Sequence, residues 1–142
     1  MIVLDTNILS EMMRARPDPH VMSWLNSQRP NQIYVSAITQ AEMLLGVALL
    51  PTGKRRTSLA TQIDALFEED FAHHCLPFDS RAASHYAQIV SDRHKSGKPV
   101  STEDAQIAAI ARSRNFQIAT RNVADFADIH ALEIVNPWVV SG

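Results

Sequence analysis

Short apolar runs alternate with longer amphipathic stretches along this sequence, an order that few folds accommodate. The runs predict buried strands at residues 2–4, 33–35, 75–78, 116–119 and 132–135, the last of them at a sheet edge. The stretches between them predict helices at about 8–13, 37–50, 54–71, 80–95 and 103–114, with a further helix beginning at Pro19. Strands that alternate with helices favour an α/β fold with a mainly parallel sheet. The length of 142 residues suits one such domain, so we expect residues 1–142 to form a single domain.

Polar residues follow two of the predicted strands at the points where they end. Asp5 comes directly after the run at 2–4, and Thr6-Asn7 is expected to cap the next helix. Thr120-Arg121-Asn122 comes directly after the run at 116–119. Ligands of open parallel sheets gather at the carboxyl ends of the strands. These residues are therefore candidates for a site, although each could equally be an ordinary helix cap or turn residue.

Two further acids lie in the first turns of predicted helices. Glu42 has apolar neighbours in the helix at 37–50, and Asp104 follows Ser101-Thr102 at the start of the helix at 103–114. Taken singly, Glu42 could face solvent and Asp104 could simply complement the helix dipole. Glu103 is the competing acid, and it should point about 100° round the helix from Asp104.

Together with Asp5, these acids indicate a metal site. Clustered carboxylates repel one another and are hard to keep ionised without a cation. A hard divalent ion with oxygen ligands relieves that repulsion, and Mg²⁺ retains several of its waters in such sites. A metal held in this way lowers the pKa of a bound water and stabilises charge on a phosphoryl oxygen, which is the chemistry of phosphodiester hydrolysis.

Composition and charge exclude several classes of protein. A net charge of −2 excludes a protein held on nucleic acid by bulk positive charge, but not local basic patches around an acidic site. Of these patches, Arg14 and Arg16 lie nearest Asp5 and are the best candidates for contacts with substrate. The single cysteine excludes a disulfide framework and a Cys-rich zinc site, and it indicates a reducing cytoplasm. No apolar run is long enough to span a membrane, and the N-terminus lacks a signal-peptide pattern.

Four segments around the polar residues resemble, in order, the motifs of PIN-domain nucleases. They are Ile2 to Leu9, Ser36 to Gly46, Gly97 to Ala111 and Ile118 to Phe126, and together they cover essentially the whole chain. The similarity is greatest to the VapC and FitB type of toxins from bacterial toxin–antitoxin modules. It implies a PIN-like three-layer α/β/α sandwich with a mainly parallel sheet of four or five strands.

The resemblance assigns roles to the acids. Asp5, Glu42 and Asp104 match the acidic triad that holds Mg²⁺ or Mn²⁺ and activates water. Asp5 and Asp104 would be the direct ligands, and Glu42 would act through a metal-bound water or help to position the nucleophile. Asn122 stands where many family members have a fourth acid. Its amide oxygen can hold a water but brings no negative charge, which argues against a second tightly held metal.

The resemblance also assigns supporting roles around the acids. Thr6 and Asn7 would shape the first loop. Thr120 and Arg121 would lie on the pocket rim, near substrate phosphate. Asp125 would support the site by hydrogen bonding to loop backbone.

The leading hypothesis is a Mg²⁺-dependent endoribonuclease that acts as the toxin of a type II toxin–antitoxin pair. The resemblance implies a homodimer and a cognate antitoxin, a small DNA-binding protein that blocks the acidic pocket with an Arg or Lys. Operator DNA would be reached only through that antitoxin. The apolar helix stripe that includes Leu44, Leu45, Leu49 and Leu50 would be either core or part of the surface that receives the antitoxin.

Two alternatives remain open. One is a regulatory subunit that holds the antitoxin in a repressor complex and has little or no nuclease activity. Asn122 and the near-neutral net charge favour it, whereas the presence of all three acids of the triad argues against it. The other is a phosphotransfer domain with Asp5 as phospho-acceptor, which would leave Glu42 and the 120–122 segment without a shared role.

Overall fold

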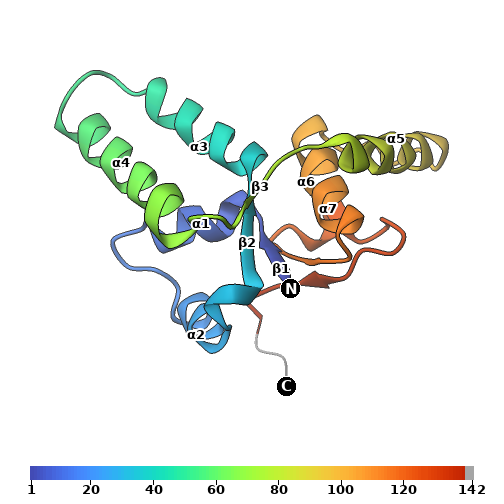
Figure 1. The fold of residues 1–142 in the computed structure, drawn as a ribbon, viewed down its shortest axis with the longest axis horizontal. Coiled ribbons are helices and arrows are strands. Elements are labelled where there is room, and N and C mark those ends of the chain that lie inside the picture. The colour runs from blue at the N-terminus through green and yellow to red at the C-terminus, as the bar shows by residue number, and fades with distance from the viewer. Residues whose placement is uncertain (140–142) are drawn as a thin grey trace.

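The centre of the molecule is a five-stranded parallel sheet in the order β3-β2-β1-β4-β5 (Figure 1). The structure is a computed structural model, and it describes residues 1–139. β1 (Ile2–Leu4) lies in the middle, between β2 (Ile33–Ser36) and β4 (Gln117–Ala119), while β3 (Cys75–Leu76) and β5 (Ile134–Val135) form the edges. All five predicted runs are therefore strands, and the last lies at an edge as expected. β3 is shorter than predicted because Pro77 has no N–H to donate to the ladder.

All six predicted helices are present and begin within two residues of their predicted starts, whereas the short helix at residues 123–126 was not predicted. The helices are α1 (Thr6–Met12), α2 (Pro19–Ser27), α3 (Ala37–Ala48), α4 (Lys54–Ala65), α5 (Ser80–Lys95), α6 (Thr102–Ser113) and α7 (Val123–Phe126). The stretch at 54–71 is not one regular helix, because α4 gives way to a π-helical turn at Leu66–Asp70. A short 3₁₀ turn, Pro30–Gln32, precedes β2. In the part of the chain that the structure describes, no helix combines the length and hydropathy needed to cross a bilayer.

The cap of α1 differs from the prediction. Thr6 and Asn7 were expected to cap this helix, but they are its first two residues, and Asp5 is the cap. The Thr6 backbone N–H donates to Asp5 Oδ1 at 2.8 Å. A carboxylate suits this position because the first N–H groups of a helix have no partner within the helix.

Two apolar cores lie on opposite faces of the sheet and give the expected three layers. Successive side chains of a strand point to opposite faces, so β1 contributes to both cores. Ile2 and Leu4 pack with buried residues of α1 to α4, and Val3 packs with buried residues of α5 to α7. Figure 1 shows α3 and α4 lying side by side and projecting beyond the sheet, away from α5.

Strand register sets up the polar edge of the sheet. Leu4 in β1 is the partner of Ala119 in β4, and the Asp5 N–H donates to the Ala119 carbonyl at 2.9 Å. The residues that follow these partners, Asp5 and Thr120, therefore stand side by side at the carboxyl end of the sheet.

Candidate active site

Asp5 is buried at the carboxyl end of the central strand and is held by three donors. Its exposed fraction is 4%. Oδ1 accepts the Thr6 N–H, and Oδ2 accepts the Thr120 hydroxyl at 2.8 Å and the Asn7 side-chain amide at 3.2 Å. These bonds leave the carboxylate little freedom to rotate, so its orientation is fixed before any ligand binds.

Glu42 reaches the same place from α3. Its Oε1 accepts the Thr6 hydroxyl at 2.9 Å, and the same hydroxyl lies 3.0 Å from the Thr39 hydroxyl. Thr39 is fully buried, whereas Glu42 is exposed. Thr6 thus connects the first turn of α1 to the carboxylate on α3, and Glu42 lines the same pocket as Asp5 while remaining exposed to solvent.

Asp104 comes from the first turn of α6. Ser101 caps this helix, and the Asp104 backbone N–H donates to the Ser101 hydroxyl at 3.2 Å. The side chain of Asp104 is half-buried, and it lines one pocket of about 530 Å³ together with Asp5 and Glu42. The neighbouring acid Glu103 is exposed and does not line this pocket, as its position on the helix predicts.

Asp5 and Asp104 are harder to ionise than ordinary carboxyl groups, because their pKa values are raised. Burial raises the pKa of Asp5; the Thr120 and Thr6 hydrogen bonds oppose that rise, and the charges of Glu42 and Asp125 add to it. Burial also raises the pKa of Asp104, and the charge of Asp5 raises it further. A cation between these groups would favour the ionised forms of both carboxyls.

The carboxylate oxygens in the pocket suit a hard divalent cation that keeps much of its water. Carboxylate oxygens are the ligands that Mg²⁺ prefers. Binding of such an ion would relieve the repulsion between the charges of Asp5 and Asp104. Among residues 1–139, no three His, Cys, Asp or Glu side chains lie close enough to enclose a metal ion. A divalent ion here would therefore be held by one or two carboxylates and completed by water, which is a common arrangement for Mg²⁺.

Comparison with known proteins identifies the family. The sequence model of the PIN domain matches residues 2–132, which is most of the chain. The chain belongs to the PIN-domain family. The match spans strands β1 to β4, all the helices described above and all three acids, so the acidic centre of the pocket belongs to the PIN domain itself.

Relatives of this PIN domain are toxins of the VapC and FitB type. The chain is 41% identical to "VapC ribonuclease Y4jK" of Sinorhizobium fredii over 138 residues, which are 97% of this chain and 98% of the relative. It is 41% identical to "Toxin FitB" of Neisseria gonorrhoeae over 140 residues, which are 97% and 99% of the two chains. A solved structure of FitAB bound to an IR36 DNA fragment superposes with a TM-score of 0.92 at 40% identity and covers 100% of this chain and 99% of that one. The fold and the toxin type expected from the sequence are confirmed.

The supporting residues of this PIN domain lie partly where the sequence predicts them. Arg121 and Asn122 line the pocket and are exposed. Thr120 does not lie on the rim, since it is 0% exposed, and it accepts the Asn7 amide and the Asn122 N–H at 3.2 and 3.0 Å. Thr6 and Asn7 shape the first turn of α1 rather than a loop.

Asp125 was expected to support the site through hydrogen bonds from its side chain. Among residues 1–139, its carboxylate makes no such bond; its backbone carbonyl accepts from Arg93 Nη2 at 3.3 Å instead. The Asp125 charge nevertheless raises the pKa values of Asp5 and Asp104. Asp125 is therefore a further negative charge beside the pocket, three residues after Asn122.

Three residues that line the pocket were not singled out from the sequence, namely Ser10, Glu11 and Trp138. Glu11 is a buried carboxylate in α1, and Trp138 follows β5. Glu11 carried a usable signal, because an acid inside the apolar stretch at 8–13 needs partners once it is buried. Trp138 carried none beyond being an aromatic residue after the last strand.

Proposed function

We propose that this chain is a metal-dependent endoribonuclease and the toxin of a type II toxin–antitoxin pair. The observation that carries the proposal is that Asp5, Glu42 and Asp104, from three distant segments, line one pocket at the carboxyl end of the sheet. Relatives named as VapC ribonucleases over nearly the full length of both chains support it.

Asp5 and Asp104 would hold a Mg²⁺ ion, with Mn²⁺ as a possible substitute, and Glu42 would contact it through water. The bound ion lowers the pKa of a coordinated water and stabilises negative charge on a phosphoryl oxygen. The three donors would hold the Asp5 carboxylate in position, and the cation would favour its ionised form. In Glu42, Oε1 accepts the Thr6 hydroxyl, which leaves Oε2 to accept a hydrogen bond from the attacking water and to orient it.

The antitoxin would bind in a groove between α3 and α4 that leads into the pocket. This groove is lined by apolar residues such as Met43, Val47 and Leu59, and it shares Thr6, Ser10 and Glu42 with the acidic pocket. An extended or helical segment lying in the groove could place an Arg or Lys among the acids, where the charges complement each other.

The apolar stripe expected at residues 37–50 lies only partly in this groove, because Leu50 lines it and the other three leucines of the stripe do not. Leu44, Leu45 and Leu49 are 43%, 59% and 76% exposed, so they are surface residues and not core. The solved structures of FitAB and of other toxin–antitoxin complexes show that relatives do assemble with antitoxins. The homodimer, the access to operator DNA through the antitoxin and the cytoplasmic location expected from the sequence remain predictions.

A second candidate is a regulatory subunit with little or no nuclease activity. The solved FitAB complex is bound to a DNA fragment, and a subunit without nuclease activity could equally belong to such a complex. Asn122 in place of an acid at the pocket favours this candidate as well.

Cleavage of total RNA by the purified chain, free of antitoxin, separates the two candidates. We expect cleavage with Mg²⁺ or Mn²⁺, none with EDTA, and none from Asp5→Ala. Antitoxin binding and circular dichroism of Asp5→Ala would show that the variant is folded, since Asp5 also caps α1. No cleavage from the folded wild-type chain with either metal would favour the regulatory subunit.

A further inference from the structure

The pocket that holds the three acids also contains a second group of residues with different chemistry. Arg14, Arg121 and Trp138 line it, and none of them belongs to the acidic triad. The volume of about 530 Å³ is within the range of sites that bind small molecules, and is larger than a metal ion and three carboxylates need. The pocket therefore has room for part of a substrate beside the acids.

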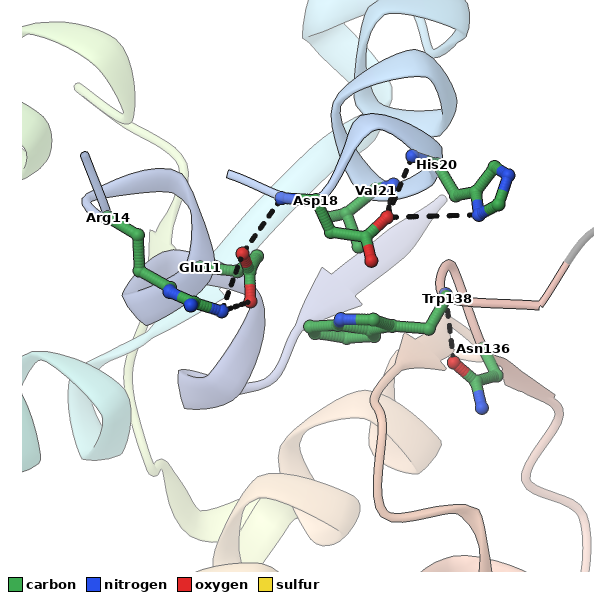
Figure 2. Close-up of polar contacts among 7 residues, drawn as sticks. All are labelled: Glu11, Arg14, Asp18, His20, Val21, Asn136 and Trp138. Carbon is green, nitrogen blue, oxygen red and sulfur yellow. Dashed lines mark hydrogen bonds and ion pairs between the residues drawn. The ribbon is translucent and has the colours of Figure 1, made fainter. Parts of the chain in front are cut away.

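Trp138 is held at the pocket by the turn that follows β5. Its backbone N–H donates to Asn136 Oδ1 at 3.0 Å, and Figure 2 shows the indole projecting from the C-terminal segment toward Glu11. Part of the ring packs against the core formed with α1 to α4, and the residue is only half-buried. The ring is thus fixed in position while part of it faces the pocket.

Arg121 stacks on this indole. Its guanidinium carbon lies 5.2 Å from the centroid of the Trp138 ring, which is the distance of a cation–π contact. Its backbone N–H donates to Asn7 Oδ1 at 3.2 Å, which anchors the segment on α1. Within residues 1–139 the Arg121 side chain forms no salt bridge, so its guanidinium is not held in a direct ion pair with a carboxylate.

A second arginine is fixed at the pocket by a buried acid. Both Glu11 oxygens accept from Arg14 Nη1, at 3.2 and 3.3 Å, and Oε2 also accepts the Asp18 N–H at 2.9 Å (Figure 2). Glu11 is 4% exposed and Arg14 is 65% exposed. A guanidinium has five N–H donors, so Arg14 is held by one nitrogen and keeps others for a ligand.

We propose that Trp138 and Arg121 form a nucleotide-binding subsite beside the acids, in which one base of the RNA stacks on the indole–guanidinium pair and Arg14 contacts a neighbouring phosphate. Bases stack both on aromatic side chains and on guanidinium planes, and arginine binds phosphate through its forked donors. The proposal rests on the proposed function in that RNA is the substrate. It specifies unpaired RNA, since a base stacked within a duplex cannot reach such a platform.

The test measures binding of a single-stranded RNA hexamer in EDTA, where cleavage is not expected. The chain has two tryptophans, and Trp24 lies on α2 against the core and not in the pocket. Trp24→Phe therefore leaves Trp138 as the only indole, and its emission reports the subsite. We expect RNA, titrated into the millimolar range, to quench this emission, and an abasic oligonucleotide of the same length to quench it far less.

Substitutions then measure how much the subsite contributes. We expect Trp138→Ala to weaken RNA binding about 10-fold, the order found for loss of one stacked base, and Trp138→Phe to weaken it by less than about 3-fold. Trp24→Phe is the matched control and should bind as the wild type does. If Trp138→Ala does not fold, the Trp138→Phe variant and the quenching titration still test whether a base stacks on Trp138.

Unchanged RNA affinity in folded Trp138→Ala, or equal quenching by abasic and normal RNA, would overturn the subsite. The outcome is separable from that of the proposed function. RNA binding that depends on Trp138 without metal-dependent cleavage would support the subsite and contradict the nuclease. Metal-dependent cleavage by the wild type, together with an RNA affinity that Trp138→Ala leaves unchanged, would contradict the subsite and not the nuclease.

Discussion

Replacing Thr120 with valine removes one hydroxyl at the centre of the site and keeps the shape of the side chain. Thr120 is fully buried, and its hydroxyl donates to Asp5 Oδ2 at 2.8 Å. It also accepts from Asn7 Nδ2 and from the Asn122 N–H. Valine would leave Oδ2 without its shortest donor and would remove an acceptor from two N–H groups.

The size of the effect follows from these contacts. A hydrogen bond to a charged group is worth about 1.5–3 kcal/mol, and a buried donor left unpaired costs about 1–3 kcal/mol. Asn7 keeps Asp5 Oδ2 as a partner and Asn122 is exposed, so part of the second cost is avoided. We expect Thr120→Val to lower the free energy of unfolding by about 2–4 kcal/mol at about pH 7.

The loss should depend on pH in a definite direction. Burial already raises the folded-state pKa of Asp5 above the ordinary value of 3.8, and the Thr120 hydroxyl holds it down. Removing the hydroxyl raises that pKa further. An acid with a raised folded-state pKa destabilises the fold as the pH rises from its ordinary pKa through the raised one. The cost of Thr120→Val should therefore shrink as the pH falls toward that ordinary pKa.

Urea denaturation followed by circular dichroism, at about pH 7 and about pH 4, measures both effects. Thr120→Ser is the control, because it keeps the hydroxyl and should cost only about 1 kcal/mol for the lost methyl group. If Thr120→Val were as stable as the wild type at neutral pH, the hydroxyl would not support Asp5. If it lost as much at the lower pH, the contact would not act on the ionised carboxylate.

Two other substitutions test the metal site and the groove separately. Burial and the charge of Asp5 raise the pKa of Asp104, so its ionised form destabilises the folded protein. The unfolding temperature of Asp104→Asn in EDTA should therefore be a few degrees above that of the wild type, and the stabilisation that Mg²⁺ gives the wild type should disappear. Calorimetry checks both, and an undiminished Mg²⁺ effect would show that the ion binds elsewhere. A Cβ at Gly46 meets no atom within 4 Å, so Gly46→Leu should fill the groove without unfolding α3, with Gly46→Ala as its control. The leucine should abolish antitoxin binding in a pull-down and the alanine should not; equal binding by both would exclude this groove as the docking site.

Local sequence patterns predicted the elements of this fold well. The apolar run at 2–4 is the central strand, and Asp5 lies at its carboxyl end, because strand burial and the polarity of the next residue are both visible in the sequence. The acids on α3 and α6 also reach the predicted pocket. A parallel sheet brings the residues after its central strands to one edge, which accounts for Asp5 and for the start of α3. Asp104 lies on α6, which follows another helix, and its place in the site was implied by the resemblance to PIN-domain nucleases.

The errors concern residues whose role depends on their neighbours in space. Thr120 was expected on the pocket rim because the resemblance to PIN-domain nucleases implies that position. It is buried because β4 pairs with β1 in a register that sets it against Asp5, and strand order and register are not visible in the sequence. Trp138 was missed because its position depends on a turn after the edge strand and on packing against a distant core.

The initial rate of RNA cleavage in Mg²⁺ by the matched variants Glu103→Gln and Asp104→Asn tests the acidic site most directly. The two changes remove the same charge from adjacent residues of α6, but only Asp104 lines the pocket. We predict that Glu103→Gln keeps the wild-type rate and that Asp104→Asn loses at least about 100-fold. Equal loss in both variants, or a wild-type rate from Asp104→Asn, would contradict a metal-dependent nuclease site built on Asp5, Glu42 and Asp104.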